Sequence, residues 1–115
     1  MGQILDATTE TFDQLVAEGT VLVDVWGPAC QPCLALMPHV ERMADERPEL
    51  KVVKVEAPKA RRLCMNLRVM GLPAYLLFLD GTEVGRLAGG DISADRLEAW
   101  VDETTTAAVG PAPGS

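Results

Sequence analysis

Two segments constrain the fold of this chain more than any other feature. Val21–Trp26 reads Val-Leu-Val-Asp-Val-Trp, a β-branched and nearly continuous apolar run, and Lys51–Glu56 is a second valine-rich segment. Because an almost unbroken apolar run favours a strand that is buried on both faces, we expect both segments to be central strands of a parallel or mixed sheet. Such a sheet needs helices to cover it, which predicts an α/β protein.

The other elements follow from the spacing of apolar residues and from turn signals. Asp80-Gly81 is a dipeptide that favours a tight hairpin turn. In chain order we expect an edge strand over 3–5, a helix over 9–18, a helix over 33–47 with Pro38 inside it, a helix opened by Pro58, a hairpin of 74–79 and 83–87, and a last helix capped by Ser93. This order places a mixed central sheet between helices on both of its faces.

Composition and charge exclude several classes of function. The chain has 115 residues, 48% of them hydrophobic, so one domain can bury a sufficient core. A net charge of −7 argues against nucleic acid as a partner, because phosphate binding needs clustered lysine and arginine. No apolar run reaches the roughly 18 residues of a membrane span, and no signal peptide is visible, so we expect a cytoplasmic protein without a membrane partner. We expect a domain over residues 1–103 and a flexible C-terminal tail over 104–115.

Cys30 and Cys33 carry the clearest chemical signal. They follow the expected strand at 21–26 and lie where the next helix begins. A helix N-terminus stabilises a thiolate, the reactive form of cysteine, through its free amides and its dipole. We therefore predict that Cys30, at the helix tip, is the exposed nucleophile of a dithiol–disulfide exchange. Cys33, one turn later on the apolar face, would resolve the mixed disulfide, and Pro32 suits the first helical turn.

Two other interpretations of this cysteine pair remain open. A zinc site would take Cys30, Cys33, His39 and Cys64 as ligands. His39 falls about 240° around the helix from Cys33, on the polar face, which disfavours zinc. The pair could also be purely structural. We favour the redox interpretation and expect no metal.

The remaining cysteine and the methionines have a simpler interpretation. Cys64 lies on the apolar stripe of its expected helix, so we expect a buried, inert thiol rather than a regulatory or dimerising one. We interpret Met37, Met43, Met65 and Met70 as core or packing residues rather than ligands.

With these motifs the chain resembles the thioredoxin family over about residues 3–103. The matching pieces are Val23-Asp24-Val25-Trp26, Cys30-x-Pro32-Cys33, Pro38 five residues after the second cysteine, Gly71-Leu72-Pro73, Asp80-Gly81 and Gly89. The resemblance implies a thioredoxin-like three-layer fold, with a mixed central β-sheet flanked by four helices. It implies a cis peptide bond before Pro73, beside the cysteines, and pairing of the Leu72 backbone with an extended substrate segment.

The resemblance also bears on the activity and the partners. It implies a protein-disulfide reductase that works without a cofactor on disulfide-containing proteins. A thioredoxin-reductase-like electron donor would return its cysteine pair to the dithiol form. We expect such a protein to be a monomer.

Asp24 places a carboxylate in the middle of an apolar strand. Burial of an unpaired carboxylate disfavours its charged form, so we expect a raised pKa. One interpretation is a structural ion pair with Lys54, which lies on the neighbouring expected strand. The other, which the resemblance implies for this position, is a proton acceptor for Cys33. We favour the second, with Lys54 tuning the charge in either case.

Two positions depart from the thioredoxin pattern. The family usually has Trp before the first cysteine and Gly after it, where this chain has Ala29 and Gln31. We expect Trp26, Gln31 and Pro32 to border the substrate, and the loss of the exposed Trp to alter the choice of partners. A dedicated reductant of one target, an oxidant or isomerase, and a non-catalytic binding module are the alternative functions. The uncharged Gln31 argues against a strongly oxidising enzyme.

Overall fold

A five-stranded sheet forms the middle layer of the structure, a computed structural model that describes residues 3–109. Its strands are β1 (Gln3–Asp6), β2 (Thr20–Trp26), β3 (Leu50–Glu56), β4 (Ala74–Leu79) and β5 (Thr82–Ala88). They lie in the order β1-β3-β2-β4-β5. β3 is parallel to both β1 and β2, whereas β4 is antiparallel to β2 and β5 is antiparallel to β4, so the sheet is mixed as expected.

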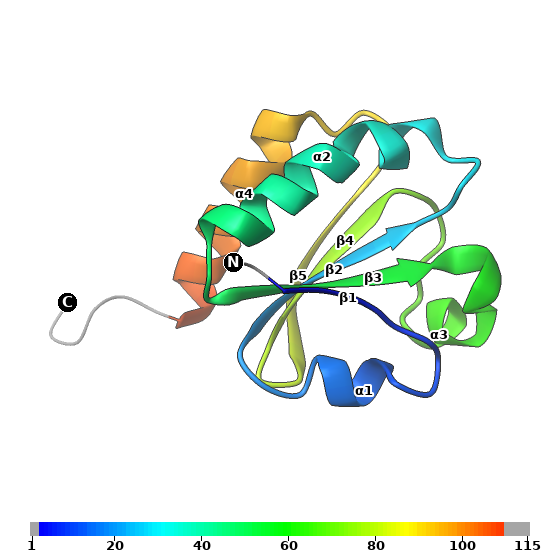
Figure 1. Cartoon of the computed structure of the whole chain (residues 1–115), viewed down its shortest axis with the longest axis horizontal. Helices are drawn as coiled ribbons and strands as arrows, with labels where there is room; N and C mark the ends of the chain where they lie inside the picture. Colours follow the sequence, from blue (N-terminus) through cyan, green and yellow to red (C-terminus); the bar gives the residue numbers. More distant parts are fainter. Residues whose placement is uncertain (1–2, 110–115) are drawn as a thin grey trace, which may run out of the picture.

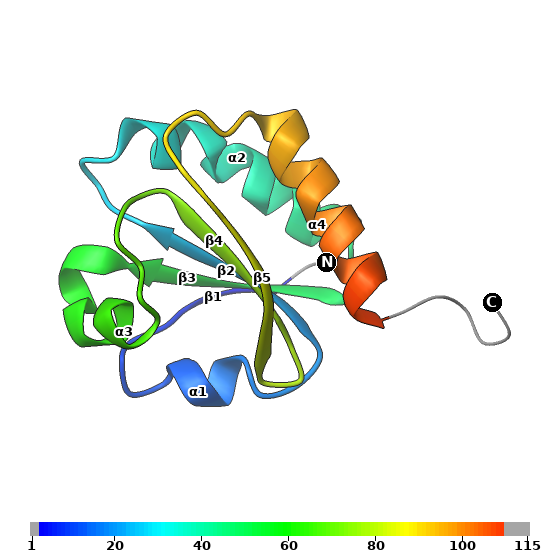
Figure 2. The ribbon, with the colours of Figure 1, turned by 180° about the vertical axis from the view of Figure 1, so that it is seen from behind.

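Helices form the two outer layers. In the described part of the chain the α-helices are α1 (Phe12–Leu15), α2 (Gln31–Glu46), α3 (Arg61–Asn66) and α4 (Ala94–Val109). Pro58, expected to open a helix, lies in a separate 3-10 helix, η1 (Ala57–Lys59), before α3. α2 and α4 cover one face of the sheet, and α1 and α3 cover the other (Figure 1). The view from behind shows the same layers (Figure 2). The expected three-layer fold, with a mixed sheet flanked by four helices, is confirmed.

The central strand β2 shows why both faces of the sheet need a cover. Val21, Val23 and Val25 pack with Phe12 and other buried side chains beneath α1 and α3. Leu22 packs on the opposite face, with buried side chains of α2 and α4. Since successive side chains of a strand point to opposite faces, a strand that is apolar at nearly every position must be covered on both.

α1 spans only Phe12–Leu15, so the first helix is shorter than the helix expected over residues 9–18. Thr8 and Thr11 hold a turn before it, where each backbone N–H donates to the other residue's hydroxyl at 2.9 and 3.2 Å. Threonine hydroxyls that bind nearby backbone groups compete with helical hydrogen bonds in this way. Beyond the helix, Gly19 adopts a φ of +75°, which ends any helical course.

The expected boundary at residue 103 falls inside a helix. α4 extends to Val109, so residues 104–109 continue the helix, and 110–115 lie outside the described residues. Packing explains the extension: a Cβ on Gly85 of β5 would lie only 2.7 Å from Thr104 Cγ2, so the helix and the strand are in close contact there. At the other end, the Ser93 hydroxyl accepts a hydrogen bond from the Arg96 N–H at 3.0 Å, as expected for a helix cap.

Candidate active site

Cys30 and Cys33 form a disulfide at the start of α2. Cys30 is the N-cap residue of the helix, and its Sγ accepts a hydrogen bond from the Cys33 N–H at 3.2 Å. The two Cα atoms are 5.3 Å apart, within the usual range for a disulfide. Cys33 is fully buried, whereas Cys30 is half-buried. α2 begins at Gln31, two residues before the expected start, because Cys30 itself caps the helix.

A second loop of the site contains a cis peptide bond between Leu72 and Pro73, as the family resemblance implied. The Pro73 carbonyl accepts a hydrogen bond from the Gly89 N–H at 3.2 Å. This bond ties the loop before β4 to the loop that follows β5. Pro73 is buried, and Leu72 remains half-buried and partly accessible.

Two glycines bring these loops close to the disulfide loop. A Cβ on Gly27 would lie 3.2 Å from Leu72 Cδ1, and a Cβ on Gly90 would lie 3.9 Å from Pro32 Cγ. A side chain at Gly27 would therefore displace Leu72 or the disulfide loop. The sequence interpretation gave Gly27 no role. Its only signal was a glycine directly after a buried strand, which is typical of close backbone approach.

Asp24 lies in β2 with none of its surface exposed. Within residues 3–109 neither of its carboxylate oxygens has a hydrogen-bond partner. Burial raises the pKa of this carboxyl to about 7, and the positive charge of Lys54 opposes the rise. Lys54 is paired with Asp24 in the β2–β3 register, yet the described residues include no ion pair between the two side chains. Lys54 Nζ instead lies 5.0 Å from the centre of the Trp26 ring, a cation–π contact.

Tyr75 is a buried polar residue that sequence reasoning missed. It pairs with Asp24 in the antiparallel β2–β4 register, so the two side chains lie on the same face of the sheet. Its hydroxyl is buried and has no hydrogen-bond partner in the described chain. Burial and the negative charge of Asp24 both raise the pKa of Tyr75. The available signal was a lone tyrosine in the otherwise apolar run Ala74–Leu79.

The residues that flank Cys30 in the sequence are uncharged and accessible. Pro28, Ala29 and Gln31 are exposed, and Pro32 is half-buried. Trp26, at the end of β2, is half-buried as well. These positions allow another chain to approach Cys30, and their role as a substrate border stays a prediction.

Two methionines contradict the expectation of a packing role. Met65 is 76% exposed and Met70 is 96% exposed. α3 turns only Leu63 fully into the core, and Met65 lies on its outer side, while Met70 belongs to the loop that leads to Pro73. The sequence interpretation took both as packing residues because methionine is apolar, and it could not show which side of α3 and of the following loop faces the solvent.

Three further expectations concerned a metal site, a membrane-spanning segment and the reactivity of Cys64. Residues 3–109 contain no group of three or more His, Cys, Asp and Glu side chains that could hold a metal ion. No helix in that range is both long enough and apolar enough to cross a bilayer. Cys64 is a half-buried free thiol, and burial raises its pKa, which disfavours the reactive thiolate.

A disulfide that can open and close at a helix tip performs thiol–disulfide exchange, and the fold that holds it here is that of a thioredoxin-like oxidoreductase. The Thioredoxin family model matches residues 3–103. A thioredoxin from Acetoanaerobium sticklandii is 39% identical over 95 residues, which cover 80% of this chain and 90% of the relative. Thioredoxin C-2 from Corynebacterium nephridii is 34% identical over 103 residues, which cover 87% of this chain and 94% of the relative.

Solved structures agree with the sequence relatives. A mutant thioredoxin from Halobacterium salinarum NRC-1 superimposes with a TM-score of 0.80 at 28% identity, covering 90% of this chain and 92% of its own. The thioredoxin of Malassezia sympodialis, at 19% identity, shares the fold with a TM-score of 0.82 over 92% of this chain and 94% of its own. The chain therefore belongs to the thioredoxin family, and it is a thiol–disulfide oxidoreductase of the protein-disulfide reductase type.

Proposed function

We propose that the reduced protein cleaves substrate disulfides with Cys30 as nucleophile and Cys33 as resolving thiol. The Cys30 thiolate attacks one substrate sulfur, the substrate S–S bond breaks, and the other substrate sulfur leaves as a thiolate. The Cys33 thiolate then attacks Cys30 Sγ, which releases the second substrate sulfur and closes the Cys30–Cys33 disulfide. The unequal burial of the two cysteines carries this assignment, because an incoming disulfide can reach half-buried Cys30 but not fully buried Cys33.

Asp24 is the proposed proton acceptor for the Cys33 thiol. It shares a sheet face with Tyr75, which packs in the cluster beneath α2, the helix that carries Cys33. With a pKa raised to about 7, the carboxyl can take up and release a proton near neutral pH. The positive charge of Lys54 acts in the opposite direction to burial and lowers this pKa.

The proposed substrate site lies between the disulfide and the cis-proline loop. An extended substrate segment would pair with the backbone of Leu72, next to Pro73. Trp26, Gln31 and Pro32 would border the segment on the side of the disulfide loop. The close approach of Gly27 and Leu72 supports this arrangement, because the two loops lie side by side there.

The proposed partners are disulfide-containing proteins as substrates and a thioredoxin-reductase-like protein as electron donor. The donor would reduce the Cys30–Cys33 disulfide to the dithiol and so restore the active form. A reducing, cytoplasmic compartment suits this cycle, and we propose that the protein acts as a monomer.

A trapping experiment tests the two cysteine roles. A Cys33→Ser variant, with Cys64→Ser added to remove the free thiol, should accumulate mixed disulfides through Cys30 in a cell extract. A matched Cys30→Ser variant with the same Cys64→Ser change should accumulate none, since Cys33 is buried. Failure of the wild type to reduce any protein disulfide would exclude the proposed function. Equal trapping by both variants would overturn the assigned order of attack.

A further inference from the structure

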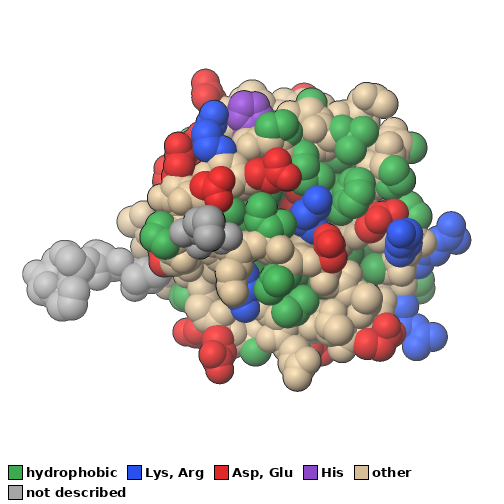
Figure 3. Space-filling view, in the orientation of Figure 1, with side chains coloured by type: hydrophobic (Ala, Val, Ile, Leu, Met, Phe, Trp, Pro, Cys, Tyr) green, Lys and Arg blue, Asp and Glu red, His purple; other side chains and the backbone are tan. Residues whose placement is uncertain are grey.

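The outer side of α3 carries a charge opposite to that of the whole protein. Residues 57–79 contain four basic residues and no acidic one, whereas all 17 acidic residues lie elsewhere in a chain of net charge −7. Figure 3 shows Lys and Arg side chains projecting from the side of the molecule where α3 lies. A basic region on an acidic protein creates a local field that favours negatively charged partners.

Three arginines of this region are free to pair with another molecule. Arg61, Arg62 and Arg68 are exposed, and no ion pair within residues 3–109 involves any of them. Met65 and Met70, 76% and 96% exposed, lie among them in the sequence. Methionine is flexible and polarisable, so exposed methionines suit surfaces that bind varied apolar side chains. We call these five residues the arginine–methionine face.

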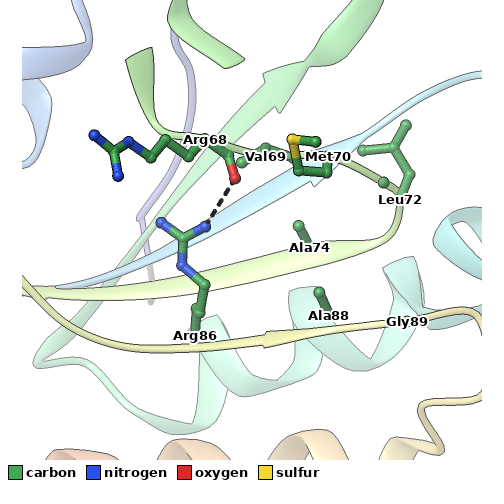
Figure 4. A pocket seen from close by; sticks show the side chains of 9 residues that line it. Arg68, Val69, Met70, Leu72, Ala74, Arg86, Ala88 and Gly89 are labelled. Carbon is green, nitrogen blue, oxygen red and sulfur yellow. Dashed lines mark hydrogen bonds between the residues drawn. The ribbon is translucent and has the colours of Figure 1, made fainter. Parts of the chain in front are cut away.

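A surface cavity of about 460 Å³ adjoins this face. Arg68, Met70 and Leu72 line it from the loop after α3, and Ala74 and Ala88 line it from β4 and β5. The two alanines are paired across the strands, and both methyl groups point toward the loop (Figure 4). Their small side chains leave room for a large apolar side chain from another molecule.

Arg86 closes one end of the cavity and is already satisfied by its neighbours. Its guanidinium donates to the carbonyls of Leu67 and Arg68 at 2.8 and 3.2 Å, and it forms an ion pair with Glu83 at 2.7 Å. Figure 4 shows the bond to the Arg68 carbonyl. Arg86 therefore holds the loop after α3 in place. The Arg68 side chain points away from Arg86 and remains available to pair with another molecule.

The cavity is continuous with the candidate active site. Leu72 lines the cavity and also contacts the disulfide loop at Gly27. Gly89 lines the cavity and also donates its N–H to the Pro73 carbonyl. A polypeptide segment that lies along Leu72 toward Cys30 would therefore pass over the cavity and reach the arginine–methionine face.

We infer that the arginine–methionine face and its cavity select substrates in which acidic residues and one large apolar residue flank the target disulfide. The apolar side chain fills the cavity above Ala74 and Ala88, and the acidic side chains pair with the arginines. This inference rests on the proposed function, because it specifies which disulfide-containing polypeptides that site accepts.

Peptide disulfides of matched sequence test the charge selection. Two peptides, identical except for Glu or Gln at two positions beside the disulfide, are mixed with the pre-reduced protein at low salt, and the second-order rate constant of reduction is measured for each. We expect the Glu peptide to react roughly threefold to tenfold faster with the wild type. The Arg61→Gln/Arg62→Gln variant should lose this preference, and added salt should weaken it.

A matched control separates the local patch from net charge. Arg42→Gln/Arg96→Gln changes the net charge by the same amount but alters α2 and α4, on the other face of the sheet. It should keep the preference for the Glu peptide. Equal rates for the two peptides with the wild type, or an equal loss in both double variants, would overturn the inference. If the wild type reduces neither peptide, the proposed function itself fails.

A cavity-filling substitution tests the apolar part of the site. Ala88→Leu places a large side chain at an exposed position of β5 that lines the cavity. The wild type should reduce a peptide with Leu beside the disulfide several-fold faster than one with Ala, and Ala88→Leu should abolish this difference. An unchanged Leu-to-Ala ratio in the variant would show that the cavity takes no part in recognition.

Discussion

Strand β2 is buried on both faces of the central sheet, but the two faces differ in chemistry. On the face beneath α2 and α4, the Asp24 carboxylate and the Tyr75 hydroxyl are buried without hydrogen-bond partners in the described chain. On the face beneath α1 and α3, the buried cluster is apolar throughout and includes Val23 and Val25. Val23 and Asp24 are consecutive residues of β2, and neither has any exposed surface.

This difference shows that one strand, β2, can place apolar side chains in the core on one face of the sheet and a titratable side chain on the other. Side chains of β2 alternate between the faces, so an unpaired carboxylate under α2 leaves the packing under α1 and α3 undisturbed. A buried unpaired carboxylate is destabilising when charged, and it is retained here on the face where the Cys33 helix packs. Four predictions test this division, beginning with the largest expected effect.

Cys30→Ser should reduce the rate of protein-disulfide reduction by at least about 10³-fold, because the attacking sulfur is removed. Cys64→Ser, on the α3 side of the sheet, should leave the rate within about twofold, since burial raises the pKa of that thiol and disfavours its thiolate. An insulin-type turbidity assay with a chemical reductant measures both. A comparable loss of rate in the two variants would contradict the view that only cysteines on the α2 side of the sheet take part in the reaction.

Asp24→Asn should stabilise the oxidised protein at high pH. The folded protein holds the Asp24 proton up to a pKa of about 7, whereas the ordinary pKa of an aspartate is 3.8, so the folded state loses stability as pH rises through this window. The variant should exceed the wild type in free energy of unfolding by up to roughly 4 kcal/mol above pH 8, and by almost nothing below pH 4. Urea denaturation at several pH values measures the difference, and a gain that does not vary with pH would refute the explanation.

Val23→Ala should have the opposite sign and no pH dependence. It removes two methyl groups from the apolar cluster beneath α1 and α3, which should lower the free energy of unfolding by roughly 2–3 kcal/mol. The same denaturation series measures it. A pH-dependent loss would mean that Val23 is coupled to a titrating group and that the two faces are not independent.

Tyr75→Phe should have the smallest effect of the four. It removes only the hydroxyl that shares the buried face with the Asp24 carboxyl. Because the hydroxyl forms no hydrogen bond with the Asp24 carboxylate in residues 3–109, its loss should change the Asp24 pKa by less than roughly one unit. Stability should change little, since the deleted hydroxyl has no hydrogen-bond partner in residues 3–109. NMR titration of the Asp24 carboxyl measures the shift, and a rise of the pKa by well over one unit would contradict the absence of a hydrogen bond between the two groups.

Local sequence patterns predicted most of the fold and part of the site. β2, β3 and the hairpin of β4 and β5 match the expected segments closely, because apolar runs and the Asp80-Gly81 turn report strand and turn propensity directly. Asp80 and Gly81 both have positive φ values, 49° and 87°, as such a turn requires. The helix ends were less predictable: periodicity could not show that Thr8 and Thr11 shorten α1, nor that Gly85 lets α4 continue along β5.

The sequence by itself determined the α/β layers, the cysteine pair at a helix start and the carboxylate inside a strand, because each depends on neighbours within a few residues. Only the tertiary structure decided that Lys54 lies over Trp26 rather than against Asp24, and that Tyr75 shares the buried face. The tertiary structure also leaves Met65 and Met70 exposed, close in the sequence to arginines that form no ion pair within residues 3–109. The physical reason is that these contacts join separate strands and loops, so they depend on register and packing, which no local pattern encodes.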